Sequence, residues 1–245
     1  MATLTVYSNS GGDGGLGTHR TSYSSAHDAA SADDNQQTNV QNTLGNDKET
    51  DSSWFVYRIF LPFDTSSLPD DATINSATLS VFCNDVRNIV SDSINAVQTT
   101  QASGTSLASS DLSLVTTTTV STAIGWSSMV ESAYNDWILN ATGLAFINKT
   151  GYTKLALRTT GDINNSTPTE YSGGIYFYCA DQVGTSQDPK LVIDYTENTT
   201  TSTTTSTSTS STSSSTTKTD TTTTTSTSST STSTSSTSPS STSSS

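Results

Sequence analysis

The sequence predicts an all-β protein, an antiparallel β-sandwich followed by a disordered tail rich in serine and threonine. Three observations support this prediction. Short apolar segments with a period of two recur over residues 1–196, turn-forming residues bound them, and helical periodicity is nearly absent. The exceptions are one turn near Ala108–Leu112 and the segment Asn140–Lys149, where an apolar face is present.

The expected strands are rich in Val, Ile, Thr, Tyr and Phe and are bounded by Gly, Asn, Asp, Ser or Pro, as is typical of sandwiches and barrels. They are Ala2–Tyr7, Trp54–Phe60, Ala77–Cys83, Ile94–Gln98, Leu114–Val120, Asp136–Leu139, Lys154–Leu157, Gly174–Ala180 and Lys190–Tyr195. Most of them lie in residues 54–196, which we assign to one β-sandwich domain.

The first strand is separated from this domain by residues 8–53, which are polar, acidic and initially glycine-rich. A structureless loop of this length is rare in a compact domain. Two interpretations remain open for residues 1–7: the strand returns to its own sheet across a long surface loop, or a linker carries it to a neighbouring subunit. Strand exchange of the second kind builds open chains of subunits.

The C-terminal segment, residues 197–245, has a different composition. From Thr199 onward every residue is Ser or Thr except Lys218, Asp220 and Pro239. Such a segment has no large apolar side chain to offset the entropy of ordering its backbone. We expect a disordered tail, and its composition is that of an O-glycosylated stalk.

Charge and hydropathy restrict the partners. The formal net charge is −13 and only nine Lys and Arg residues occur, without a cluster, so we expect no nucleic-acid partner. No apolar run approaches the ~20 residues that span a bilayer, so we expect no membrane span. The start, MATLTVYSN, lacks a basic region followed by an apolar core, which predicts no secretory signal in this chain.

Candidates for catalysis are few. The two histidines, His19 and His27, lie in the polar N-terminal segment, where we expect exposed and inactive side chains. No Gly-x-Ser-x-Gly motif is present, and no cysteine has an evident histidine partner. The sequence therefore predicts that the protein is not an enzyme.

Two weak candidates for ligand binding remain. Asp47, Glu49 and Asp51 alternate along the chain and offer hard oxygen ligands for calcium, although a complete calcium-binding loop is absent and a solvated acidic loop is the simpler interpretation. Trp126, between two patterned runs, is the best candidate for an exposed ring that stacks on sugars, whereas the aromatic residues inside strands are expected in the core.

Candidate modification sites are of two kinds. Five asparagines begin Asn-x-Ser/Thr sequons and are candidates for N-glycosylation: Asn140, Asn148, Asn164, Asn165 and Asn198. Cys83 and Cys179 each end a predicted strand. They are either two buried free thiols or a single disulfide, and the disulfide requires an oxidising compartment.

The stretch YRIFLPFDTSSLPDDATINSATLSVF resembles the signature of DNRLRE-type β-sandwich domains. The matching residues are Arg58, Phe63, Asp64, Leu68, Pro69, Ile74, Ala77 and Leu79. Tyr134–Arg158 and the closing Asp181–Tyr195 are similar to later segments of that family, and the opening MATLTVYSN looks like that of uncharacterised metagenomic and phage-associated relatives. The resemblance implies a jelly-roll-like sandwich on secreted, cell-surface or virion proteins, with no catalytic residues and, in some relatives, carbohydrate binding.

These observations lead to two hypotheses. The preferred one is a non-catalytic structural protein on a cell or virion surface, whose partner is a further copy of itself in a filament or coat. The alternative is a carbohydrate-binding or adhesive module with a polysaccharide partner, using Trp126 or nearby tyrosines and calcium at Asp47–Asp51.

Overall fold

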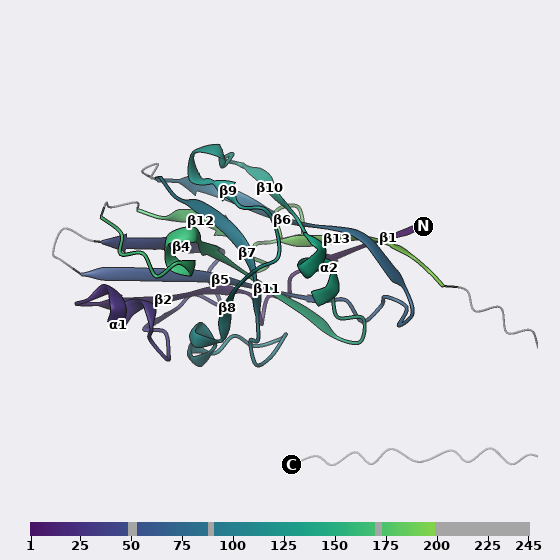
Figure 1. Ribbon diagram of the computed structural model, residues 1–245, viewed down its shortest axis with the longest axis horizontal. Helices are drawn as coiled ribbons and strands as arrows, with labels where there is room; N and C mark the ends of the chain where they lie inside the picture. The colour runs from purple at the N-terminus through teal and green to yellow at the C-terminus, as the bar shows by residue number, and fades with distance from the viewer. Residues whose placement is uncertain (49–52, 88–90, 170–172, 199–245) are drawn as a thin grey trace, which may run out of the picture. The chain divides into compact units, whose positions relative to one another are not determined.

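A computed structural model describes residues 1–48, 53–87, 91–169 and 173–198 of the chain (Figure 1). The predictions made for residues 199–245 lie outside the described residues. Within the described part, no helix is long and apolar enough to cross a membrane.

The predicted all-β, antiparallel fold is confirmed, and the paired strands of the described residues run antiparallel. The strands are β1 (Ala2–Tyr7), β2 (Gly14–Arg20), β3 (Asp34–Asn35), β4 (Gln41–Lys48), β5 (Trp54–Asp64), β6 (Thr73–Val86), β7 (Ser93–Thr99), β8 (Val115–Thr119), β9 (Ile124–Gly125), β10 (Ala133–Ile138), β11 (Tyr152–Thr159), β12 (Ile175–Tyr178) and β13 (Lys190–Thr196). The short helices are α1 (Tyr23–His27), η1 (Ser109–Leu114), η2 (Trp126–Ser128), α2 (Ala141–Phe146) and α3 (Thr160–Ile163). Each of the nine predicted strands overlaps an observed strand; the expected turn near Ala108–Leu112 overlaps η1, and the segment Asn140–Lys149 contains α2.

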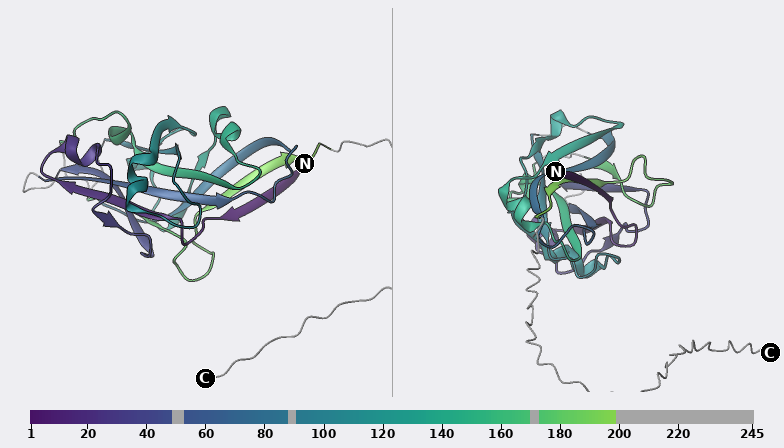
Figure 2. Two further views of the ribbon diagram at one scale, coloured as in Figure 1. Left: turned by 90° about the horizontal axis from the view of Figure 1, so that it is seen from below. Right: turned by 90° about the vertical axis from the view of Figure 1, so that its right-hand side faces the viewer.

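The strands form two layers joined by β4. One layer contains β1, β13, β6, β10 and β12, and the other contains β2, β3, β5, β11, β7, β8 and β9. The first half of β4 pairs with β12 and its second half pairs with β5, so one strand belongs to both layers. The end-on view in Figure 2 shows the strands wrapped around a common interior. The arrangement is β-sandwich-like.

The main core lies between the two layers. Ile59, Leu61 and Phe63 of β5 contribute to it from one side, and Leu79 and Val81 of β6 contribute from the other. Because side chains alternate along a strand, these residues mark the inner faces of the two layers.

The layer that contains β5 is also covered on its outer face. Phe60 packs there with Leu16, Val97, Leu112 and Ala156, in a second cluster that includes η1. Burial on both faces explains why IFLPF in β5 is continuously apolar instead of alternating.

The prediction of a long polar loop or linker at residues 8–53 was wrong for most of that segment. It contains β2, α1, β3 and β4, and β2 and β4 both pair with β5. The strand β2 was not predicted because it is rich in glycine. A methyl group at Gly17 would clash with the ring of Tyr57, so this position must lack a side chain. Its pairing depends on main-chain groups, which carry no apolar signature.

In this single chain β1 returns to its own sheet. It pairs with β13 from Ala2, opposite Tyr195, to Tyr7, opposite Lys190. It stands at the end of the strand order, and no other strand of the described residues pairs with its outer edge. Exchange of β1 between subunits stays a prediction.

Candidate functional site

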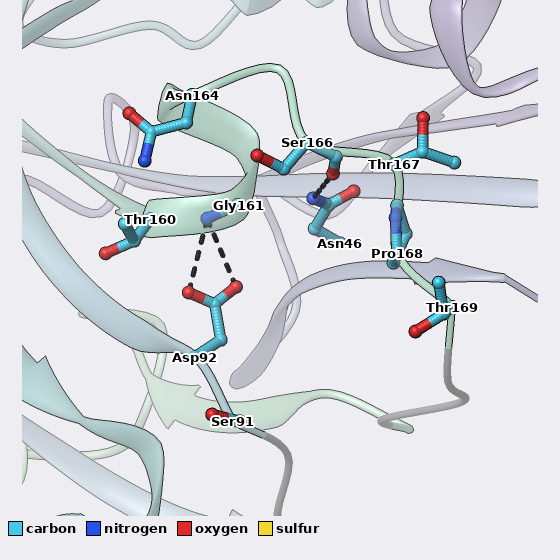
Figure 3. Close-up of a pocket in the computed structure, with 10 residues that line it drawn as sticks. All are labelled: Asn46, Ser91, Asp92, Thr160, Gly161, Asn164, Ser166, Thr167, Pro168 and Thr169. Carbon is cyan, nitrogen blue, oxygen red and sulfur yellow. Dashed lines mark hydrogen bonds between the residues drawn. The ribbon is translucent and has the colours of Figure 1, made fainter.

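A polar pocket of about 370 Å³ lies beside the second half of β4 (Figure 3). We call it the β4 pocket. It is lined by one residue of β4, two residues that precede β7, and the segment from α3 onward: Asn46, Ser91, Asp92, Thr160, Gly161, Asn164, Ser166, Thr167, Pro168 and Thr169. Hydroxyl and amide groups dominate this lining, so the pocket offers hydrogen bonds to a polar ligand.

Asn46 and Asp92 are the best-placed polar side chains of the β4 pocket. Figure 3 shows the Asp92 carboxylate pointing toward Gly161, whose main-chain N–H lies 3.2 Å from both carboxylate oxygens. Asn46 is buried, and its Nδ2 donates to the hydroxyl oxygen of Tyr23 at 3.2 Å and to the carbonyl oxygen of Ser166 at 3.4 Å. The buried Oδ1 of Asn46 has no hydrogen-bond partner, which leaves one acceptor for a ligand.

A second hollow, of about 180 Å³, uses the neighbouring residues of β4. We call it the aromatic groove; its lining is Thr43, Gly45, Asp47, Phe55, Tyr57, Gly173, Gly174 and Tyr176. The cross-strand register explains why residues of β4 and β5 lie side by side in this groove, since Asp47 pairs with Phe55 and Gly45 pairs with Tyr57.

The rings of the aromatic groove continue into a stacked row. His19 stacks on Phe55 with 4.1 Å between ring centroids, and Phe55 stacks on Tyr57 at 6.0 Å. The guanidinium carbon of Arg87 lies 4.3 Å from the centroid of the Tyr176 ring. Such half-buried aromatic surfaces present flat apolar faces to which sugar rings can stack.

The carboxylates of both hollows are held by main-chain groups. Asp47 accepts from the N–H of Gly173 at 2.9 Å and from that of Lys48 at 3.0 Å, much as Asp92 accepts from Gly161. Neither histidine is among the residues that line the β4 pocket or the aromatic groove. The arrangement is suited to binding a polar ligand.

The prediction that Trp126 presents an exposed ring was wrong. Trp126 is 1% exposed and belongs to the core between the layers. Its position in IGWSS resembles a loop, but η2 turns the indole inward, and burial of so large a ring outweighs the polarity of its neighbours. Trp126 cannot stack on a sugar while the protein is folded.

The calcium candidates of the sequence fall largely outside the described residues. Glu49 and Asp51 lie there, and Asp47 lines the aromatic groove with the two main-chain contacts given above. Calcium binding by these three residues stays a prediction.

Cys83 and Cys179 are free thiols, and both are buried in the main core. Burial raises the pKa of Cys83 to about 12 and raises that of Cys179 well above its ordinary value. Of the two possibilities left open by the sequence, the structure has the pair of buried thiols and no disulfide. Neither thiol has the thiolate character that reactivity requires.

All five sequon asparagines are exposed: Asn140, Asn148, Asn164, Asn165 and Asn198. Some have structural roles, since Asn140 caps α2 by accepting from the N–H of Gly143. Asn165 has a positive φ of 52°, a conformation that asparagine tolerates better than most residues. Their glycosylation stays a prediction.

A buried ion-pair cluster was not predicted from the sequence. Arg58 of β5 and Arg158 of β11 both donate to the carboxylate of Asp162 in α3, with Nε–Oδ2 distances of 2.8 and 2.6 Å. Burial alone raises the pKa of Asp162, but the hydrogen bonds and charges of the two guanidinium groups outweigh burial and lower that pKa to about 2. Arg158 and Asp162 are four residues apart, whereas Arg58 is distant in sequence and is brought to them by the pairing of β5 with β11.

Arg58 also holds the short helices against the sheet. Its Nη1 donates to the carbonyl oxygen of Leu112 at 3.0 Å, and its Nη2 donates to that of His27 at 3.1 Å. The expectation that His27 is exposed was wrong, because its side chain is 14% exposed and Nε2 lies 2.8 Å from the carbonyl oxygen of Asp162. The arginine of the family-like motif is thus a structural residue in this chain.

No protein-family model matches the chain, and no curated protein is similar enough to it to count as a relative. The resemblance to DNRLRE-type domains therefore stays a prediction.

Proposed function

We propose that the protein is a non-catalytic structural protein of an extracellular or virion surface, which self-assembles into a filament or coat through the edge of β1. The observation that carries this proposal is the nature of that edge. β1 has the sequence ATLTVY, and no described strand pairs with its outer side. Natural proteins usually protect such an edge with charges, proline or a bulge.

The composition of β1 supports strand addition. Its residues are Ala, Leu, Tyr and the β-branched Thr and Val, and it contains neither a charged residue nor proline. Its inward residues Leu4 and Val6 pack on the main core, which keeps the strand in a regular register with β13. A second copy of the chain can add a strand to this edge, or two copies can exchange β1, since both modes use main-chain hydrogen bonds.

Electron microscopy of the concentrated full-length protein tests this proposal. We expect regular filaments or shells for the wild type, and dispersed particles for Thr5→Lys, which places a charge on the exposed face of the edge strand. Ser110→Lys is the matched control, because it adds the same charge in η1, away from that edge. Dispersed wild-type particles at all concentrations would refute assembly. If Thr5→Lys and Ser110→Lys both lose filament or shell formation to the same extent, the role of β1 is refuted.

The aromatic groove favours a second candidate function, binding of polysaccharide. Phe55, Tyr57 and Tyr176 supply ring faces, and the lining also contains the carboxylate of Asp47. Stacking combined with a few oriented polar groups is how compact sites recognise small polar ligands.

A glycan-binding screen tests the second candidate. We expect Tyr176→Ala to weaken binding and Tyr7→Ala, a change of an exposed tyrosine outside the groove, to leave it unchanged. If Tyr176→Ala binds glycans as strongly as the wild type, the aromatic groove is not the glycan-binding site.

A further inference from the structure

The layer that contains β1 and β6 has a second open edge, at β10. The strands β13 and β10 pair with opposite sides of β6, because Thr78, Leu79 and Ser80 are each paired with a residue of both strands. Since β1 follows β13, β1 and β10 are the two outermost strands of this layer. Among the described strands, only β6 pairs with β10 and only β13 pairs with β1. Each of the two therefore has an outer side whose main-chain groups no described strand uses.

The directions of the strands make these two edges complementary. Each pairing along the series β1, β13, β6 and β10 is antiparallel, so β1 runs in the same direction as β6 and β10 runs in the opposite direction. When two copies of the chain lie side by side in the same orientation, β1 of one copy is antiparallel to β10 of the next. The alternation of the layer then continues across the contact, and the two edges can form an ordinary antiparallel ladder.

The two strands also agree in the faces that their side chains present. Leu4 and Val6 of β1 pack on the main core, and Trp137 of β10 belongs to that core. Thr5 and Asp136 lie on the exposed faces of the same strands. Directly opposed residues of an antiparallel pair share a face, so the registers that match these faces and overlap most place Thr5 opposite Asp136 or one pair away from it.

Charge favours contact between β1 and β10 over contact between two β10 strands. Asp136 is the single charged residue of β10, whereas β1 has none. Pairing of two β10 strands brings both Asp136 carboxylates onto one face of neighbouring strands, where like charges are unfavourable. By contrast, β1 offers threonine hydroxyl groups: Thr3 Oγ1 already donates to Asp194 Oδ1 at 2.6 Å within the pair of β1 and β13. Thr5 can donate to Asp136 of a neighbouring copy in the same way.

We propose that the β10 edge receives β1 of the next copy, so that subunits join head to tail in one continuous antiparallel layer. This inference rests on the proposed self-assembly and names the second surface that it needs. A contact between two β1 edges closes a two-fold dimer and leaves β10 uncovered, whereas a contact between two different edges can be repeated along a filament. The contact also covers apolar groups, since Ile138 of β10 is 68% exposed and Leu4 and Val6 are only partly buried.

Two variants that each block one edge test the proposal, in full-length protein at a concentration at which the wild type assembles. Thr5→Lys blocks the β1 edge and Ile138→Lys blocks the β10 edge, because lysine on an edge strand opposes strand addition. Each variant alone should remain monomeric in sedimentation velocity. An equimolar mixture should form a species of twice the monomer mass and nothing larger, because it contains one open β1 edge and one open β10 edge. Circular dichroism of each variant checks that it is folded.

The outcomes separate this inference from the proposed function. Assembly of Ile138→Lys on its own would overturn the role of β10 and leave self-assembly through β1 in place. An equimolar mixture that stays monomeric would overturn the head-to-tail contact. A wild type that is monomeric at every concentration would refute the proposed function, and this inference with it.

Cross-linking locates the contact without the use of lysine. Thr5→Cys and Asp136→Cys place thiols at exposed positions, whereas Cys83 and Cys179 are buried, so the wild type should give no cross-linked dimer. A short bis-maleimide should link the two variants in an assembled equimolar mixture and should give no dimer with either variant alone. Links between two copies of Thr5→Cys would show a contact between two β1 edges and overturn the proposal.

Discussion

At the scale of single residues, the most informative feature is the cluster of Arg58, Asp162 and Arg158. The two guanidinium groups share one carboxylate, and all three side chains are at most 4% exposed. Removing one partner from such a buried group is costly, because the remaining charges stay desolvated. The cluster also fastens α3 to two strands, so its loss affects more than local electrostatics.

Asp162→Asn should lower the free energy of unfolding by about 3–5 kcal/mol, because two buried cations lose their counter-ion. Urea unfolding at pH 7 measures the change. Asp136→Asn, at an exposed position of β10, is the control and should change stability by less than about 0.5 kcal/mol. Similar stabilities for the two variants would contradict the structural role of the cluster.

The lowered pKa of Asp162 implies that the stability of the folded protein depends on pH. The pKa of Asp162 is about 2 in the folded chain against an ordinary value of 3.8, so the folded state holds this proton less tightly than the unfolded state does. The resulting stabilisation, on the order of 2 kcal/mol, is fully present above about pH 4 and is lost as the pH falls toward 2. Urea unfolding of wild type and Asp162→Asn at pH 5 and pH 2.5 tests this prediction. The difference in free energy of unfolding between the two proteins should be smaller at pH 2.5 than at pH 5. An equal difference at both pH values would contradict the prediction.

At the scale of elements, β2 is a strand that the sequence pattern does not predict. Its sequence GGLGTHR lacks the β-branched, alternating pattern, and yet it pairs with β5 over residues 14–20. Gly17 is needed because the Tyr57 ring lies over it. By contrast, β1 and β13 were predicted almost to the residue, because their alternation matches one buried and one exposed face.

Gly17→Ala should destabilise the protein by about 1–3 kcal/mol, because the added methyl displaces Tyr57 from a packed position. Gly125→Ala is the matched control, since its methyl would meet only Ser128 Oγ at 3.6 Å and its φ of −61° suits alanine. Thermal unfolding of both variants is the measurement. Equal midpoints would show that Tyr57 is free to move.

At the scale of the whole molecule, the two layers behave as one unit because they share β4 and a common core. Trp137 of β10 is fully buried, and its Nε1 donates across the core to the carbonyl oxygen of Ile94 in β7 at 3.0 Å. The outer cluster around Phe60 covers the outer face of the layer that contains β5 and packs η1 against it. Among the described residues up to position 198, these connections leave no division between independent cores.

Unfolding of the sandwich should therefore be a single cooperative transition. In a Trp54→Phe background, the fluorescence of Trp126 and Trp137 reports on the core between the layers, and far-ultraviolet circular dichroism reports on the strands, so the two urea curves should coincide. Two separated midpoints would indicate that the layers unfold one after the other and that β4 does not couple them.

The sequence alone determined the fold class and nine of the strand positions, since a period of two and turn residues are local signals that need no partner to be read. It also restricted the chemistry, because charge and motif content are properties of composition. Only the tertiary structure decided that Trp126 is buried, that residues 8–48 are structured, and that β4 joins both layers. It alone gathered the β4 pocket and the aromatic groove. The physical reason is that each of these features depends on side chains distant in sequence, and their proximity is set by strand register and by packing between layers.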